Sequence, residues 1–135
     1  MNTAIRYFSK FGHSAKMAEV VSQVTGAKAE TVAVPISQPV DTLYLGSGLF
    51  LGKISAEMVS FIKTLTPDKV RHVVCFGSCA ILESPVPQMR QLLEAQGMNV
   101  DERSFTCRGS MGPLHARRPN QQDLDSLRQF IQSVI

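Results

Sequence analysis

The stretch Thr3-Ala4-Ile5-Arg6-Tyr7-Phe8-Ser9-Lys10-Phe11-Gly12-His13-Ser14 decides the fold of this chain. Residues 3–8 form a short run that favours a β-strand, and the polar turn at 9–14 ends it. Apolar residues then recur at i, i+3, i+4 and i+7, the spacing of one helix face, at Met17, Val20, Val21 and Val24. Gly26 follows, where a helix commonly ends. The chain therefore opens with a strand, a turn and a helix.

The same alternation continues to the end of the chain. Further strands are predicted at 31–34, 42–45, 72–76 and 100–106. Further helices are predicted from the apolar stripe of Met58, Phe61, Ile62 and Leu65, from the N-cap pair Ser84-Pro85, and from Asn120 with Asp123 in its first turn. The continuous apolar run at 73–76 indicates a strand buried on both faces, as in a parallel sheet. These elements predict a doubly wound α/β fold.

One connection in this series is too short. The segment between the strands predicted at 31–34 and 42–45 cannot hold a full helix. Either the helix between the second and third strands is shortened or missing, or one of these two strands is misassigned.

Length and composition narrow the class of protein. The 135 residues fit a single domain, 1–135, that can bury a core. The 14 Lys and Arg against 11 Asp and Glu leave a mild net charge of +3, and the chain has no Trp. We therefore expect no nucleic-acid binding. The apolar runs are too short to span a membrane, and the N-terminus lacks a signal-peptide pattern. Three cysteines, an odd number, indicate reduced thiols and a cytoplasmic location.

The turn at 9–14 is suited to binding a phosphate group. Ser9 and Ser14 offer hydroxyls, Gly12 allows the backbone to approach closely, and the following helix N-terminus adds partial positive charge. An ordinary capped turn, with Ser14 as a plain N-cap, explains the same residues equally well. The turn lacks the Gly-Lys-Ser/Thr ending of a P-loop and the three glycines of a dinucleotide fingerprint.

Several segments together resemble the flavodoxin family. Residues 7–14 are similar to its phosphate loop, and 41–50 are similar to its third strand and first flavin-ring loop. Phe76-Gly77-Ser78-Cys79 resembles the end of its fourth strand and second ring loop, and 118–124 resembles the start of its final helix. The resemblance covers nearly the whole chain and rests on the order and spacing of these motifs. It implies a five-stranded parallel sheet with strand order 2-1-3-4-5 and one bound FMN.

The resemblance also assigns the residues of an FMN site. Ser9, Gly12 and Ser14 would hold the phosphate, together with the N–H groups of 10–14, which are those of Lys10, Phe11, Gly12, His13 and Ser14. Residues 47–52 would cover one face of the flavin ring, with Ser47, Gly48, Leu49, Phe50 and Gly52 as the candidates. Residues 77–81 would cover the pyrimidine edge and the other side, through Gly77, Ser78 and Cys79. No catalytic side chain and no metal site are predicted.

Two departures from the family pattern affect the expected chemistry. With no Trp to stack on the flavin, Phe50 is the available aromatic, and the alternative is that it belongs to the core. The edge is basic where flavodoxins are acidic: Lys10, His13, Lys16, Lys53, Arg108, His115, Arg117 and Arg118 stand against Glu83. Positive charge near the flavin favours its anionic reduced form, so we expect a less negative potential and an acidic partner protein or an anionic substrate. A redox pair of Cys79 and Cys107 is a further alternative, if their Cα atoms lie within about 7 Å.

The predicted function is electron transfer between a reductase and a redox partner by an FMN-binding, flavodoxin-like protein, a monomer or weak dimer. A first alternative is an FMN-dependent reductase or oxidase that acts directly on a small quinone- or tetrapyrrole-like substrate. A second alternative is a flavodoxin-fold binding module that has lost redox activity.

Overall fold

The computed structural model describes residues 2–10, 12–50, 52–79, 84–108 and 118–135. Within these ranges the strands are β1 (Thr3–Tyr7), β2 (Ala29–Thr31), β3 (Val40–Gly48), β4 (Val70–Cys79) and β5 (Val100–Arg108). The helices are α1 (His13–Thr25), α2 (Ala56–Lys63), α3 (Val86–Ala95) and α4 (Gln121–Val134).

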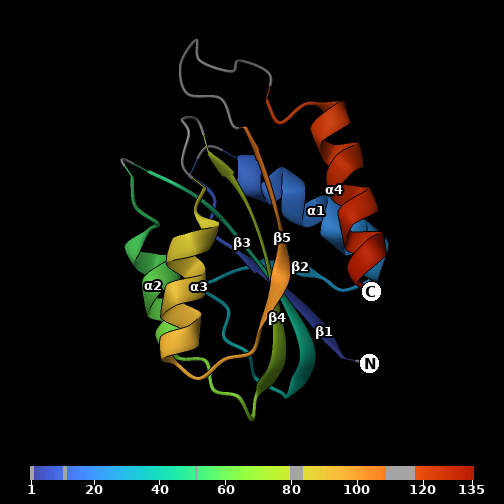
Figure 1. Ribbon diagram of the computed structural model, residues 1–135. Helices are drawn as coiled ribbons and strands as arrows, with labels where there is room; N and C mark the ends of the chain where they lie inside the picture. The colour runs from blue at the N-terminus through green and yellow to red at the C-terminus, as the bar shows by residue number, and fades with distance from the viewer. Residues whose placement is uncertain (1, 11, 51, 80–83, 109–117) are drawn as a thin grey trace.

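The strands form one parallel sheet in the order β2-β1-β3-β4-β5. Helices α1 and α4 lie on one face of the sheet, and α2 and α3 lie on the other (Figure 1). The predicted doubly wound fold and its strand order are confirmed. The helix between the second and third strands, predicted to be shortened or missing, is missing, because residues 32–39 contain no helix.

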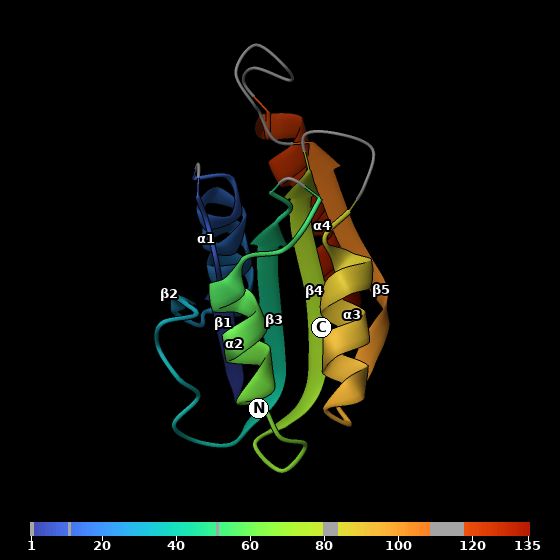
Figure 2. The ribbon, with the colours of Figure 1, turned by 90° about the vertical axis from the view of Figure 1, so that its left-hand side faces the viewer.

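The position of β2 differs from the prediction. The strand was expected at 31–34, but it spans Ala29–Thr31, and a turn follows in which the Val34 N–H donates to the Thr31 carbonyl at 3.0 Å. The β-branched run suggested a strand because of its composition, whereas the pairing of β2 with β1 ends at Tyr7 and Thr31. In the second view, the segment after β2 loops round the edge of the sheet beside α2 (Figure 2).

Arg6 holds this helix-free connection in place. Its buried guanidinium donates from Nε to the Val34 carbonyl at 2.8 Å and from Nη2 to the Pro35 carbonyl at 3.1 Å. Nη2 also lies 3.3 Å from a carboxylate oxygen of Glu30. Burial lowers the pKa of Arg6, and the Glu30 charge opposes that effect. One β1 side chain thus supplies donors for carbonyls that no helix satisfies.

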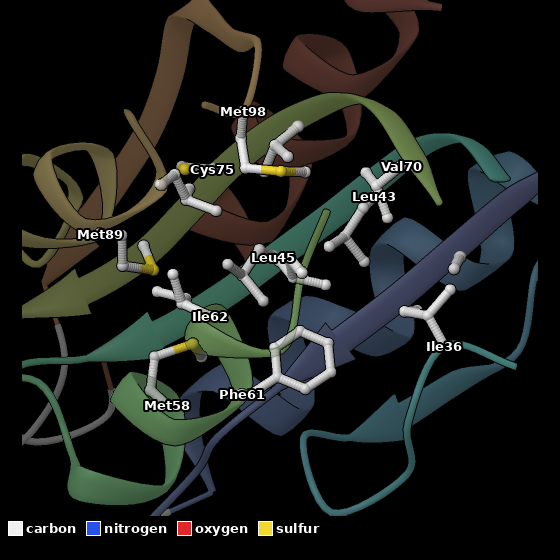
Figure 3. Close-up of a cluster of buried hydrophobic side chains, with 14 of the residues drawn as sticks. Ile36, Leu43, Leu45, Met58, Phe61, Ile62, Val70, Cys75, Met89 and Met98 are labelled. Atoms are coloured by element: carbon white, nitrogen blue, oxygen red, sulfur yellow. The ribbon is translucent and has the colours of Figure 1, made fainter. Parts of the chain in front are cut away.

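Two hydrophobic clusters fill the space between the sheet and its helices. The larger lies under α2 and α3, where Leu43, Leu45 and Cys75 of the sheet meet Met58 and Met89 of the helices (Figure 3). The other lies under α1 and α4 and includes Ile5, Met17, Phe76 and Leu127. The continuous apolar strands β3 and β4 therefore contribute to both clusters, as the sequence predicted.

The helix ends follow local chemistry. As predicted, Gly26 caps α1 at φ 79° and Asn120 caps α4 with Asp123 in its first turn. The two α4 residues also form a complete capping box, which was not predicted. The start of α3 differs by one residue, since Pro85 stands at the N-cap position. Ser84 still contributes, because its Oγ accepts the Val86 N–H at 3.1 Å.

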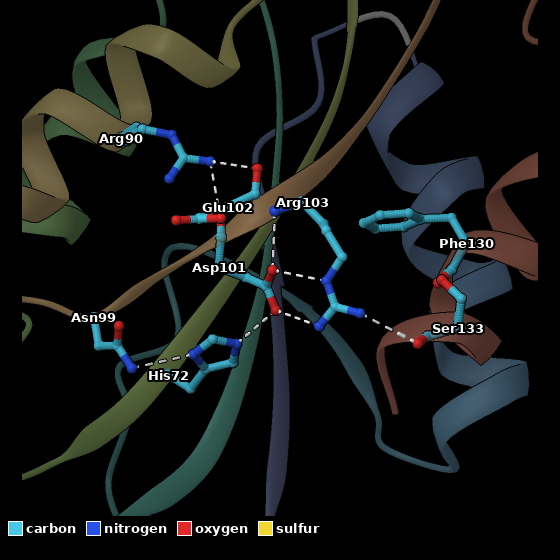
Figure 4. Close-up of polar contacts among 8 residues, drawn as sticks. All are labelled: His72, Arg90, Asn99, Asp101, Glu102, Arg103, Phe130 and Ser133. Carbon is cyan, nitrogen blue, oxygen red and sulfur yellow. Dashed lines mark hydrogen bonds and ion pairs between the residues drawn. The ribbon is translucent and has the colours of Figure 1, made fainter.

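Strand β5 carries an irregularity that the sequence did not predict. Val73 pairs with Val100 but Cys75 pairs with Ser104, so β5 uses four residue steps where β4 uses two. The buried Asp101 carboxylate accepts from the Arg103 backbone N–H at 2.9 Å and from two guanidinium nitrogens of the same residue (Figure 4). His72 Nε2 lies 2.9 Å from the other side of this carboxylate. The cluster therefore satisfies backbone that the bulge removes from the ladder.

Candidate functional site

The carboxyl ends of β1, β3 and β4 bring the predicted site segments to one edge of the sheet. In the register, Tyr7 lies beside Gly46, and Gly48 lies beside Ser78. Of the residues assigned to the flavin ring, Ser47 and Gly48 end β3, and Gly77, Ser78 and Cys79 end β4, whereas the sequence predicted them in loops. This is the edge at which open α/β sheets bind ligands. Of the predicted site residues, Phe11 lies outside the described residues.

The turn at 9–14 has an open helix N-terminus. Ser9 Oγ accepts the Gly12 N–H at 2.9 Å, which closes the turn. Gly12 is the N-cap of α1 at φ 90°, in the left-handed region, and provides no side chain to cap the helix. Ser14, in the first turn of the helix, is buried, with 2% of its surface exposed. The first N–H groups of this 13-residue helix thus receive no side-chain cap from Gly12.

The loop after β3 folds back on itself beside this turn. Phe50 and Lys53 exchange both backbone hydrogen bonds, at 2.7 and 3.0 Å. The half-buried Phe50 ring packs over Gly48 and lies edge-on to Phe8, with ring centroids 5.9 Å apart. Lys10 Nζ lies 5.8 Å from the centre of the Phe50 ring. Phe50 therefore lies at the edge of the site and not in the core.

The end of β4 approaches its neighbours without side-chain bulk. A Cβ on Gly77 would lie 2.5 Å from Pro85 Cγ and 2.6 Å from the Ser47 carbonyl oxygen. Only glycine allows the second predicted ring segment to lie this close to β3 and to the start of α3. Ser47 and Ser78 are buried on either side of it.

Gln88, on α3, contacts one of the predicted site loops, and the sequence analysis did not single it out. Its Oε1 accepts the Ile54 N–H at 3.0 Å, and its Nε2 donates to the Gly52 carbonyl at 2.7 Å. This side chain ties the loop after β3 to the opposite helix. No motif marks Gln88, because its partners lie more than 30 residues away along the chain.

The redox pair considered for Cys79 and Cys107 does not form. All three cysteines are buried free thiols. Cys79 is in register with Arg108 and accepts a hydrogen bond from its guanidinium at 3.5 Å, whereas Cys107 Sγ lies 3.8 Å from Met17 Sδ. Cys107 is in register with Ser78, so the two cysteines project to opposite faces of the sheet. Burial raises the pKa of Cys107 to about 12 and also raises that of Cys79.

Part of the predicted basic rim is paired within the chain. Arg118 binds the Asp123 carboxylate through Nε and Nη2, with the second contact at 2.6 Å, and this pairing raises the pKa of Arg118. Lys10, Lys16 and Lys53 are exposed. His115 and Arg117, with the opposing Glu83, lie outside the described residues.

A cleft of about 890 Å³ borders the turn on the side where no helix follows β2. Phe8, Val32, Pro35 and Phe61 form its apolar walls, and Ser9 and Gly12 belong both to the cleft and to the predicted phosphate turn. In the part of the chain that the structure describes, no helix is long and apolar enough to cross a membrane. The same residues include no group of three or more His, Cys, Asp or Glu that could hold a metal ion.

Comparison with known proteins identifies the fold. No family model matches the chain, and no curated protein matches it. Among solved structures, an archaeal flavodoxin is 18% identical with a TM-score of 0.80, covering 99% of this chain and 96% of its own. Flavodoxin 2 from Bacillus cereus is 15% identical with a TM-score of 0.74, covering 98% and 97%. The chain has the flavodoxin fold.

The same fold also occurs inside a larger enzyme. Rubredoxin oxygen:oxidoreductase from Desulfovibrio gigas is 18% identical with a TM-score of 0.76, over 98% of this chain but 34% of that protein. This chain therefore spans about a third of that enzyme's length.

Proposed function

We propose that this protein binds FMN and transfers electrons between a reductase and a redox partner. The observation that carries the proposal is the turn at 9–14. Gly12 leaves the N-terminus of α1 without a side-chain cap, and the hydroxyls of Ser9 and Ser14 belong to the same turn. Such a donor set suits a phosphate dianion. The flavodoxin fold of the chain supports the same assignment.

The rest of the site fits a flat ring beside the phosphate. We assign one wall to the loop of Leu49, Phe50 and Gly52, and the other to Gly77, Ser78 and Cys79. When bound, FMN would supply the electron chemistry itself. The chain would bind its phosphate through α1, hold the ring between the two loops and limit the access of water through Phe50.

The exposed lysines give this proposal an electrostatic consequence. Lys10 and Lys53 belong to the two segments that would flank the flavin. Their charge stabilises an anionic reduced ring, so we expect a second one-electron potential less negative than in acidic flavodoxins. The same charges favour an acidic partner protein, whose rate of reaction should fall as salt rises.

FMN binding by a matched pair of glycine variants tests the proposal. Gly12 and Gly26 cap opposite ends of α1 at φ 90° and 79°, and neither has a neighbour within 4 Å of an added Cβ. Alanine at either position should cost about 1–2 kcal/mol of stability. Only Gly12→Ala changes the phosphate turn, so it alone should weaken FMN binding, by at least tenfold, in a fluorescence-quenching titration. Intact wild-type protein that leaves added FMN fluorescence unchanged contradicts the proposal and supports a non-redox binding module.

A direct reaction with a small substrate is the second candidate function. The cleft beside Phe8 favours it, since its volume of about 890 Å³ falls within the range of ligand sites. Turnover of a quinone by the FMN-loaded protein and a chemical reductant, saturating with quinone concentration, would establish this activity. A reaction that stays linear in quinone concentration would favour the electron carrier.

A further inference from the structure

The cleft of about 890 Å³ extends along the whole of α2. Its α2 wall runs from Ala56, the first residue of the helix, through Ser60 to Thr64, the C-cap. The opposite wall is the segment after β2, which includes the exposed Pro35 and loops round the edge of the sheet beside α2 (Figure 2). Parallel strands are usually connected by a helix. Because residues 32–39 contain none, no second helix covers this side of α2.

The cleft has an apolar interior and an apolar rim. Phe8 and Phe61 belong to its walls. On the rim, Val34 lies between two lining residues, Ala33 and Pro35, and 38% of its surface is exposed. It is one of two large hydrophobic residues that are exposed in the part of the chain that the structure describes. Apolar surface gathered at one exposed place is typical of a site that another protein covers.

Two exposed charges lie on α2 at this surface. Glu57, in the first turn, is the only charged residue among the described residues that line the cleft, and Lys63 ends the helix. Neither has an ion-pair partner within the described ranges. Glu57 is three residues before Ser60, and Lys63 is three residues after it. Helix geometry places both about 4.5 Å from Ser60 along the axis, in opposite directions and on opposite sides of it.

This arrangement of charges is complementary to itself. A two-fold axis through Ser60, perpendicular to α2, reverses the direction of the helix and exchanges its two sides. It therefore brings Glu57 of one protomer opposite Lys63 of its partner, and Lys63 opposite Glu57. The same axis brings Ala56 opposite Thr64, so short side chains meet at both ends of the contact.

We propose that the surface formed by the cleft and α2 is a dimer interface, in which a second copy of this chain packs its α2 antiparallel to the first. The occupant is a second copy because the charges on α2 match those of the same helix reversed. The inference goes beyond the proposed function and does not depend on FMN. Since Ser9 and Gly12 line the cleft as well as the phosphate turn, the second copy also covers one side of that turn.

Two charge-reversal variants of the full chain test the interface. Glu57→Lys and Lys63→Glu each place like charges opposite each other at two points of the contact. In sedimentation equilibrium we expect the wild type to show a monomer–dimer equilibrium. The dimer dissociation constant of either variant alone should rise by about tenfold or more.

An equimolar mixture of the two variants is the decisive sample. Each copy then supplies the charge opposite to that of its partner, so the mixture should form a dimer about as stable as that of the wild type. Glu57 and Lys63 also suit the dipole of their own helix. That effect acts within one chain, and mixing two variants would not restore it.

Glu19→Lys is the matched control. Glu19 is exposed on α1, which covers the opposite face of the sheet, and its reversal changes the net charge as much as Glu57→Lys does. We expect the control to stay within about twofold of the wild-type dissociation constant. Ser60→Arg, at the centre of the contact, should give a monomer whose circular dichroism matches that of the wild type.

Several results would overturn the dimer. These are a wild type that stays monomeric at every concentration, variants that dimerise as tightly as the wild type, and a mixture that dissociates as readily as its components. Equal weakening by Glu19→Lys would overturn it too, because net charge would then govern association. A monomeric wild type whose cleft binds a quinone would assign the cleft to a small ligand instead. FMN uptake, measured separately, decides the proposed function whichever of these results is found.

Discussion

Single side chains hold the backbone of this protein where it departs from regular structure. Arg6 bonds the carbonyls after β2, Gln88 bonds the loop after β3, and Asp101 bonds the bulge of β5. In each case the backbone group that is bonded, a carbonyl or an N–H, is not paired in the hydrogen-bond ladder of the sheet. A buried polar group without such a partner costs about 1–3 kcal/mol, so each of these residues has a measurable contribution.

Asp101 should make the free energy of unfolding fall at acidic pH. The Arg103 guanidinium, then its backbone N–H and His72, hold the pKa of the Asp101 carboxyl well below its usual range. A carboxyl whose pKa is lowered on folding stabilises the protein above its unfolded pKa of about 4, and this contribution is lost as the pH falls below that value. Asp101→Asn should therefore lower the free energy of unfolding at pH 7 by about 1–3 kcal/mol.

Urea titrations at several pH values check this prediction. The difference between the wild type and Asp101→Asn should shrink as the pH is lowered from 7 toward 3. Glu102→Gln, at an exposed neighbouring position in β5, is the control and should stay within about 0.5 kcal/mol of the wild type at neutral pH. A constant difference at every pH would mean that the carboxylate charge is not what stabilises the bulge.

At the scale of an element, the conformation of the segment between β2 and β3 depends on Arg6. We expect Arg6→Met to lower the free energy of unfolding by about 1–3 kcal/mol, because it removes the buried partner of Glu30 and leaves the Val34 and Pro35 carbonyls without their donor. Lys28→Met is the matched control. Lys28 pairs with the same Glu30 at 3.7 Å but is 85% exposed, so its loss should cost about 0–1 kcal/mol. Equal losses in the two variants would contradict the role of Arg6.

Elements were predictable from the sequence where local patterns agree with packing. The apolar run of β4, the stripe of α2 and the Asn120 N-cap of α4 each depend on residues close together in the chain, and each was predicted correctly. The position of β2 was not predicted correctly, because it depends on the pairing of Glu30 with Arg6, which lies 24 positions earlier in the chain. The bulge of β5 depends on how the strand pairs with β4. The role of Gln88 depends on its contacts with a loop that lies far away along the chain. The strand order could thus be predicted from the resemblance of the sequence to flavodoxins, but the contacts that fix the loops could not.

At the scale of the whole molecule, Cys75 reports when the sheet opens. It is fully buried in β4, and burial raises the pKa of its thiol to about 12. At pH 8 the reactive thiolate fraction in the native state would be about 10⁻⁴. We expect Cys75 to react with a thiol reagent only through global unfolding, and Cys79, at the sheet edge beside Arg108, to react first.

Mass spectrometry of the labelled peptides gives the rate for each cysteine. The Cys75 rate should rise with urea in parallel with the unfolded fraction, while denatured protein should label all three thiols quickly. Rapid labelling of Cys75 without denaturant would show that the centre of the sheet opens locally.

The strand order has a consequence for a growing chain. Strand β1 is made first, yet it is flanked by β2 and β3, and β3 ends 41 residues after Tyr7. At roughly 5–20 residues per second, a ribosome needs about 2–8 seconds to extend that far. During this interval the earliest apolar strand has no partner on its β3 side. The nascent protein therefore depends on α1, which follows directly, or on a chaperone, to shield Ile5 until translation supplies its neighbour.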